Sequence, residues 1–168
     1  MQFKTTLLAA AVVVAGLVAQ PFQTAQAGTA TTTMGVKIVI PNACDSVVAA
    51  TDMDFGTPTG PLTAAIDKTS TITVTCTKDA AFHIGLDGGS ANDINARVMS
   101  DGNGNTVGYQ LYTDSGRTDV WGNTVGTDAM AETGTGTSQD ITVYGEVPAQ
   151  NTPPAGNYSD TVAVTVTF

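Results

Sequence analysis

The chain has 168 residues, with 15 acidic and 6 basic side chains, a formal net charge of −9 and 42% hydrophobic residues. This length suits one domain with an adequate core. The acidic balance argues against binding to nucleic acid or docking on anionic lipid, because both require a basic face. Beyond an apolar run at the N-terminus there is no second long one, so no membrane insertion is expected.

The chain starts with the pattern of a secretory signal peptide. Lys4 supplies a positive charge, and residues 7–19 (LLAAAVVVAGLVA) form an apolar run that is short for a membrane helix. AQA at 25–27 places small residues at both positions that signal peptidase reads. We predict cleavage after Ala27, which also removes Lys4 and takes the net charge from −9 to −10. The alternative is an uncleaved anchor.

A strand pattern follows soon after the predicted cleavage site. In the segment 32–44 (TTMGVKIVIPNAC), apolar side chains recur at every second position, which is typical of a strand with one buried face. These side chains are Met34, Val36, Ile38 and Ile40. Pro41 follows at once and lacks a backbone donor, so it predicts a hinge there. Segments near a chain start are usually polar, which raises the question of whose sheet this strand completes.

Cys44 and Cys76 are the two cysteines. In an exported protein a disulfide between them is the default. Closing a loop of about 33 residues stabilises a fold by roughly 3.7 kcal/mol in the chain-entropy model. The alternative is a metal site or a catalytic thiol pair. The spacing does not match a zinc site and His83 is the only histidine, so no metal is predicted here.

Short alternating segments between turn clusters predict an all-β sandwich or barrel. The expected strands are residues 70–76, 81–89, 106–114, 139–149 and 157–168. Gly- and Pro-rich turn segments lie between several of them. The last strand carries Val162, Val164, Val166 and Phe168 on one face.

A sandwich that ends in a strand leaves one edge unpaired, and such an edge promotes aggregation unless it is covered. A spare strand at 34–40 and an open edge at 157–168 favour one arrangement, in which the spare strand of one molecule adds to the sheet of the next. A head-to-tail join of this kind that does not close produces a filament.

One polar residue, His83, and one polar segment, 101–106, are candidate sites. His83 alternates with apolar neighbours, so we expect it to face solvent, and no nucleophile with an orienting group accompanies it. The segment 101–106 (DGNGNT) resembles the first half of a calcium loop, but its twelfth position falls on Tyr112, where a bidentate Glu is needed. We therefore expect a tight loop, with no metal, no cofactor and no catalytic residue.

Asp160 is acidic, although it shares the face of the apolar residues in the last strand. One interpretation is a hydrogen bond to a turn near the start of the strand. The other is an ion pair with Arg117 or Arg97.

Six segments, in order, resemble the spore coat protein U domain family, which includes the pilin subunits of archaic chaperone–usher pili. They are MGVKIVIPNAC (34–44), ITVTC (72–76), IGLDGG (84–89), YQLYTDSGRTDVWG (109–122), VYGEVPAQNTPPAGNY (143–158) and YSDTVAVTVTF (158–168). The closing segment is the most specific. The resemblance covers essentially the whole predicted mature chain.

The resemblance implies an immunoglobulin-like β-sandwich that lacks one strand and is completed by a donor strand from a neighbouring subunit. The implied parts are a signal peptide (1–27), a donor-strand extension (28–41) and a pilin domain (42–168). The donor strand is expected at about 29–40, with Met34, Val36, Ile38 and Ile40 as the buried plugs. The acceptor edge, which a chaperone also binds, is expected at Val162, Val164, Val166 and Phe168.

The implied partners are copies of this chain or related pilins, a periplasmic chaperone and an outer-membrane usher. The implied location is a pilus at the cell surface, reached through the periplasm. With one domain and a donor extension, the chain resembles a shaft subunit that supports adhesion and biofilm formation without enzymatic activity.

The alternative class is a secreted monomeric sandwich that binds a carbohydrate or another surface ligand. Its first strand would pair within its own sheet, and Trp121 and Tyr112 are the aromatic residues that such a site would use for stacking. The discriminating question is whether residues 28–40 pair in cis or in trans.

Overall fold

The computed structural model describes residues 26–45 and 49–168. Apart from Gln26 and Ala27, the predicted signal peptide lies outside the described residues. The chain divides into two units between Ile38 and Val39. In the first unit, residues 26–38 are exposed and adopt neither helix nor strand.

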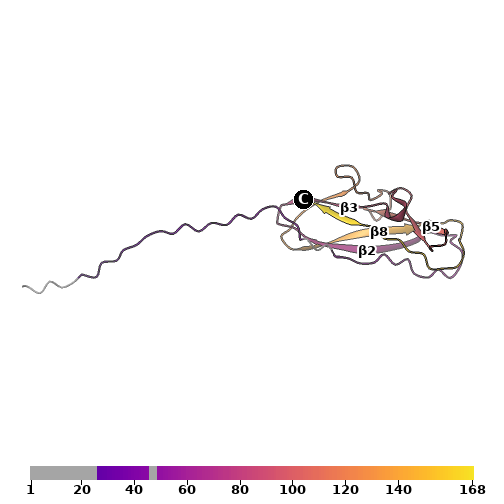
Figure 1. Ribbon diagram of the computed structural model, residues 1–168, viewed down its shortest axis with the longest axis horizontal. Helices are drawn as coiled ribbons and strands as arrows, with labels where there is room; N and C mark the ends of the chain where they lie inside the picture. The colour runs from indigo at the N-terminus through magenta and orange to yellow at the C-terminus, as the bar shows by residue number, and fades with distance from the viewer. Residues whose placement is uncertain (1–25, 46–48) are drawn as a thin grey trace, which may run out of the picture. The chain divides into compact units, whose positions relative to one another are not determined.

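The second unit is a β-sandwich whose larger sheet has the strand order β1-β2-β8-β6, with every pair antiparallel. Its strands are β1 (Ala49–Ala50), β2 (Ile66–Thr75), β8 (Ser138–Val147) and β6 (Gln110–Tyr112). Figure 1 shows β2 and β8 side by side, and their register runs from Ile66 opposite Val147 to Thr75 opposite Ser138.

The smaller sheet has the order β7-β3-β9 and is also antiparallel. Its strands are β7 (Met130–Thr133), β3 (Ala81–Leu86) and β9 (Val164–Thr167), and β9 ends beside the C-terminus in Figure 1. A separate two-stranded ribbon pairs β4 (Val98–Ser100) with β5 (Thr106–Gly108). A single 3₁₀ turn, η1 (Gly89–Ala91), is the one helical element in the described parts of the chain.

The core lies between the two sheets because each long strand turns alternate apolar side chains inward. In β2, Ile72 and Val74 are buried, while the neighbouring Thr71, Thr73 and Thr75 are more exposed. The same alternation buries Phe82, Ile84 and Leu86 of β3 and Ile141, Val143 and Val147 of β8. Trp121 is fully buried in this core, and its indole Nε1–H donates a 2.8 Å hydrogen bond to the Ile84 carbonyl.

Arg97 is a buried cation, 1% exposed, that joins the loop after β3 to the core. Its guanidinium donates to the carbonyl oxygens of Leu86, Asp87, Ile94 and Trp121 and to Oε1 of Gln110, at 2.7–3.2 Å. Burial lowers the pKa of Arg97 from its ordinary value. These hydrogen bonds compensate for the loss of water around the charge.

The all-β prediction is confirmed, and β2, β3 and β8 overlap three of the predicted strands. The predicted strand 106–114 is instead divided at Tyr109 into β5, which pairs with β4, and β6, which pairs with β8. The fifth predicted strand, 157–168, is regular only over Val164–Thr167, with an isolated bridge at Ser159. The reason is that β3 ends at Leu86, so the residues before Val164 lack a continuous partner. The short strands β1, β4 and β7 were not predicted, because two to four residues show too little alternation.

Among the described residues there is no helix of the length and hydrophobicity needed to cross a membrane.

Candidate functional site

A groove of about 460 Å³ opens along the sandwich between the segments 50–55 and 158–164. Its floor consists of core side chains from both sheets, namely Ile72, Leu86, Leu111 and Val143. The first segment contributes Met53 and Phe55, and the Phe55 ring lies 6.3 Å from the Tyr109 ring, centroid to centroid. The groove is therefore a largely apolar trough whose floor is the core of the sandwich.

Each side of the groove adjoins an edge strand, β1 at Ala50 and β9 at Val164. Within 26–45 and 49–168, β1 pairs only with β2, and β9 pairs only with β3. Each is the last strand of its sheet, so each leaves one row of backbone N–H and C=O groups without a strand partner.

The hydrogen bonds of Ala163 show which way the edge of β9 faces. Its N–H donates to Asp87 Oδ1 at 2.9 Å, and its carbonyl accepts from the Asp87 N–H at 3.1 Å, so both groups point toward the β3 side. Because backbone groups alternate along a strand, those of Val162 and Val164 point to the opposite, open side. The side chains of Val162, Val164 and Val166 pack against the core.

One end of the groove is polar. The Tyr109 hydroxyl donates a 2.7 Å hydrogen bond to Asp160 Oδ2, and the Ser90 backbone N–H donates a 2.9 Å bond to Asp160 Oδ1. Burial acts to raise the pKa of Asp160, but these hydrogen bonds outweigh it, so the pKa lies below its ordinary value. Burial, followed by the bond to Asp160, raises the pKa of Tyr109.

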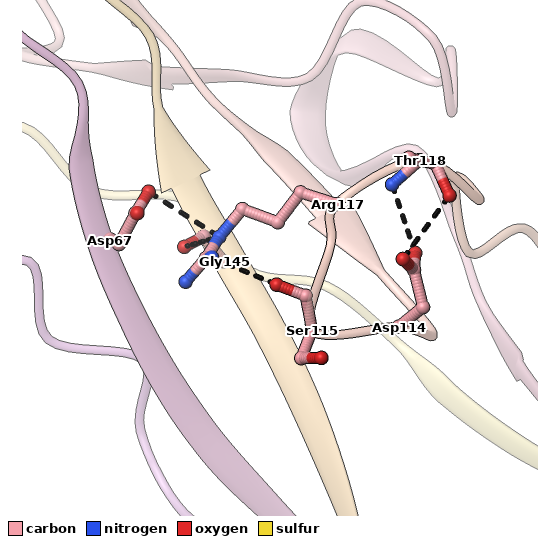
Figure 2. Close-up of polar contacts among 6 residues, drawn as sticks. All are labelled: Asp67, Asp114, Ser115, Arg117, Thr118 and Gly145. Carbon is pink, nitrogen blue, oxygen red and sulfur yellow. Dashed lines mark hydrogen bonds and ion pairs between the residues drawn. The ribbon is translucent and has the colours of Figure 1, made fainter.

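This network decides between the two interpretations of Asp160 in favour of the turn, since Ser90 belongs to η1. Arg97 is occupied by carbonyl oxygens. Arg117 instead pairs with Asp67, with its Nε 3.3 Å from Asp67 Oδ1, and also donates to the carbonyls of Gly145 and Ser115 (Figure 2).

The N-terminal segment carries exposed apolar side chains. Met34, Val36, Ile38 and Ile40 are 71–85% exposed, and the structure assigns no strand to residues 26–43. Soluble proteins rarely expose several large apolar side chains together, and where they do, the side chains usually mark an interaction site.

The segment after Pro41 is fastened to the end of β2. Cys44 and Cys76 form the predicted disulfide, which is confirmed. The Thr77 N–H donates to the Ala43 carbonyl at 2.8 Å, and the Thr77 hydroxyl lies 3.2 Å from the Pro41 carbonyl. Residues 41–45 are therefore held at the end of β2, and the hinge at Pro41 stays a prediction.

The structure places two of the four predicted acceptor side chains, Val162 and Val164, in the groove. Val166 packs against the core next to them, and Phe168 is 62% exposed. The opposite wall at 50–55 was not predicted from the sequence. The signal was present, because Met53 and Phe55 alternate with Asp52 and Asp54, but the stretch is too short to stand out.

Neither of the two polar candidates lines the groove. The Asp101 carboxylate accepts hydrogen bonds from the backbone N–H groups of Asn103 and Asn105 and from the Asn105 side chain, within its own loop. His83 is half-buried, opposite Thr167 of β9 and Ala131 of β7. No group of three or more His, Cys, Asp or Glu side chains in the described parts is placed to hold a metal ion.

Comparison with known families gives one match that spans most of the chain. The model of the Spore Coat Protein U domain matches residues 30–165. The chain belongs to the spore coat protein U domain family. The matched region contains the apolar plugs at 34–40, the disulfide, both walls of the groove and the first half of β9.

A curated relative of this spore coat protein U domain chain is Protein U of Myxococcus xanthus. The two are 33% identical over 177 residues, with 97% of each chain covered.

A similar solved structure is the CsuC–CsuE chaperone–tip adhesion subunit pre-assembly complex from the archaic chaperone–usher Csu pili of Acinetobacter baumannii. A chain of that complex matches with a TM-score of 0.55 and 25% identity over 77% of this chain, and the match spans 40% of the other chain's length. Together with the two open sheet edges, this similarity identifies the sandwich of the spore coat protein U domain as immunoglobulin-like and short of one strand.

Proposed function

We propose that this protein is a structural shaft subunit of a surface pilus, in which residues 28–40 of one copy fill the groove of the next. The single observation that carries the proposal is the groove itself, an apolar trough between two unpaired sheet edges. A strand placed there would bond to the backbone groups of Val162 and Val164 that face the open side, and it would cover the apolar floor.

The lengths of the two elements agree. Residues 34–40, fully extended, span about 23 Å at roughly 3.3 Å per residue, and the C-terminal edge from Asp160 to Thr167 spans about 26 Å on the same basis. The four exposed plugs, Met34, Val36, Ile38 and Ile40, recur every second residue, so all four would face the floor together. Burial of each contributes on the order of 1.5 to 3 kcal/mol.

Assembly in trans is the arrangement that we infer for the N-terminal segment. Residues 26–40 carry the four plugs without forming a strand, while β1 and β9 each leave an edge without a strand partner among the described residues. The anchoring of residues 43–45 at the end of β2 is consistent with an arm that leaves the sandwich at a defined point.

The implied assembly route uses a periplasmic chaperone, which covers the groove until exchange, and an outer-membrane usher. The similarity to a chaperone–tip adhesion subunit complex of Csu pili supports this route. The role is mechanical and involves no chemistry. Adhesion and biofilm formation are the functions that such a filament would support.

The decisive experiment compares the full chain with a version that lacks residues 28–40, both expressed in the periplasm with the matching chaperone and usher. Negative-stain microscopy and size exclusion report on assembly. Filaments from the full chain and none from the truncation are expected. A stable full-length monomer, with a truncation that unfolds, would instead favour the monomeric binding module.

A matched pair of point variants separates inward from outward positions. Val36 and Val39 are the same residue type and are 83% and 88% exposed. Val36→Asp should abolish filaments because it places a charge in the apolar floor, whereas Val39→Asp, on the other face of the strand, should leave them. Equal effects of both substitutions would contradict the predicted plug face.

A further inference from the structure

The proposed donor segment carries one charged side chain. Residues 28–40 (GTATTTMGVKIVI) contain Lys37 and otherwise only small, hydroxyl or apolar residues. If Val36 and Ile38 face the floor of a groove, Lys37 lies on the opposite, solvent-facing side of the strand. Its ammonium group would then meet whatever lies along the rims of the acceptor groove.

The two rims differ in charge. Along the C-terminal edge the residues that alternate with the core valines are Thr161, Ala163, Thr165 and Thr167, all of them exposed and uncharged. Along the other rim, Asp52 and Asp54 are exposed on either side of the half-buried Met53. A cation on the outer face of an inserted strand therefore finds its counter-charge on the rim at 50–55.

The two aspartates are not equivalent. Asp52 lines the groove. In the described structure its carboxylate makes no hydrogen bond, whereas Asp54 Oδ1 accepts a 2.7 Å bond from the Gly56 N–H. The carboxylate of Asp52 is thus the one that lies at the groove and is free to accept an incoming ammonium group.

We propose that Lys37 of one copy pairs with Asp52 of the next and sets the register of the inserted strand. This inference rests on the proposed function. Cross-strand pairs of opposite charge lie about 5 Å apart and stabilise a sheet. The plugs are all of similar size and recur every second residue. If the inserted strand slipped by two residues, its apolar face would still point inward, so side-chain shape alone specifies the register weakly.

The net charge of the chain is a second reason to expect a pair between Lys37 and Asp52. Each copy carries a formal charge of −9 before processing, so two copies repel each other as they approach. Lys37 brings a positive charge to the segment that has to reach an acidic rim. We therefore expect the pair to favour insertion as well as register, and to weaken as salt increases.

The test uses the complex of the full mature chain with its chaperone, and a fluorescently labelled peptide of residues 28–40. The amount of peptide captured is measured for the four combinations of wild-type or K37E peptide with wild-type or D52K protein. Each single change should reduce capture roughly threefold to tenfold, and the double change should restore it to within about twofold. The matched control is D54K, which alters the same rim by the same charge and should leave capture within about twofold.

Two negative outcomes have different meanings. If the wild-type peptide is not captured by the wild-type protein, the proposed function fails. The second outcome is that the wild-type peptide is captured, but capture of the K37E peptide by the D52K protein falls by as much as the two single changes together predict. That result would refute the ion pair and leave donor-strand assembly standing. If the reduced capture caused by each single change disappears at about 0.5 M salt, the interaction is electrostatic. If the reduction persists at that salt concentration, the electrostatic explanation is contradicted.

Discussion

Tyr109 and Asp160, 51 positions apart in the chain, meet at the polar end of the groove, where the tyrosine hydroxyl donates a 2.7 Å hydrogen bond to Asp160 Oδ2. The second oxygen of Asp160 accepts from the Ser90 N–H in η1. One carboxylate thus joins the C-terminal segment, the strand region around Tyr109 and the turn after β3.

The first prediction concerns acid stability. Because the pKa of Asp160 is lowered in the folded state, its contribution to stability is fully present above the pKa of an unfolded Asp, about 3.9, and is lost as pH falls through the folded value. Asp160→Asn should therefore cost about 1–3 kcal/mol at pH 7 and progressively less below about pH 4. Urea unfolding at a series of pH values measures this difference.

The control for this experiment is Asp52→Asn, because Asp52 is exposed and makes no hydrogen bond in the described structure. Its unfolding free energy should stay within about 0.5 kcal/mol of the wild type. A cost of Asp160→Asn that does not change between pH 7 and pH 2 would show that the ionised carboxylate is not the stabilising species.

The second prediction concerns Gly89. Its φ is +59°, and a Cβ at this position would lie 2.1 Å from Asp160 Oδ2. Gly89→Ala should therefore combine backbone strain with a collision, at about 2–5 kcal/mol of unfolding free energy. Gly102 has a similar φ of +75°, and a Cβ there would have no neighbouring atom within 4 Å, so Gly102→Ala should cost only about 1–2 kcal/mol. If denaturant titrations show that both variants lose the same unfolding free energy, the collision with Asp160 does not contribute.

The third prediction concerns the disulfide between Cys44 and Cys76, which are separated by 32 positions. Replacing both with Ser should lower the unfolding free energy by roughly 3–4 kcal/mol in the chain-entropy model. Intact mass before and after alkylation of the exported protein should show no free thiol. Two labelled cysteines would mean that the bond does not form in the cell.

The fourth prediction concerns Arg97. Arg97→Met removes the donors that the buried carbonyls of Leu86 and Trp121 use, so it should cost about 3 kcal/mol or more. Lys78→Met, at an exposed position, is the control and should change stability by less than about 0.5 kcal/mol. A thermal melt of both variants makes the comparison, and an Arg97 variant that melts with the wild type would contradict the role assigned to this residue.

The alternation of apolar side chains was sufficient to predict β2, β3 and β8, because a half-buried strand of six to ten residues repeats its pattern three times or more. The cysteine pair was predictable from export and number alone. Neither signal depends on which strands become neighbours.

The groove required the tertiary structure. Its two walls come from segments about a hundred residues apart, and the local pattern of 50–55 is too short to mark it as a wall. The partner of Asp160 was equally undecided, because sequence spacing does not specify whether a carboxylate meets an arginine or a tyrosine 51 positions away. Local periodicity determines which face of each segment is apolar, whereas only the packing of the two sheets determines which edges remain open.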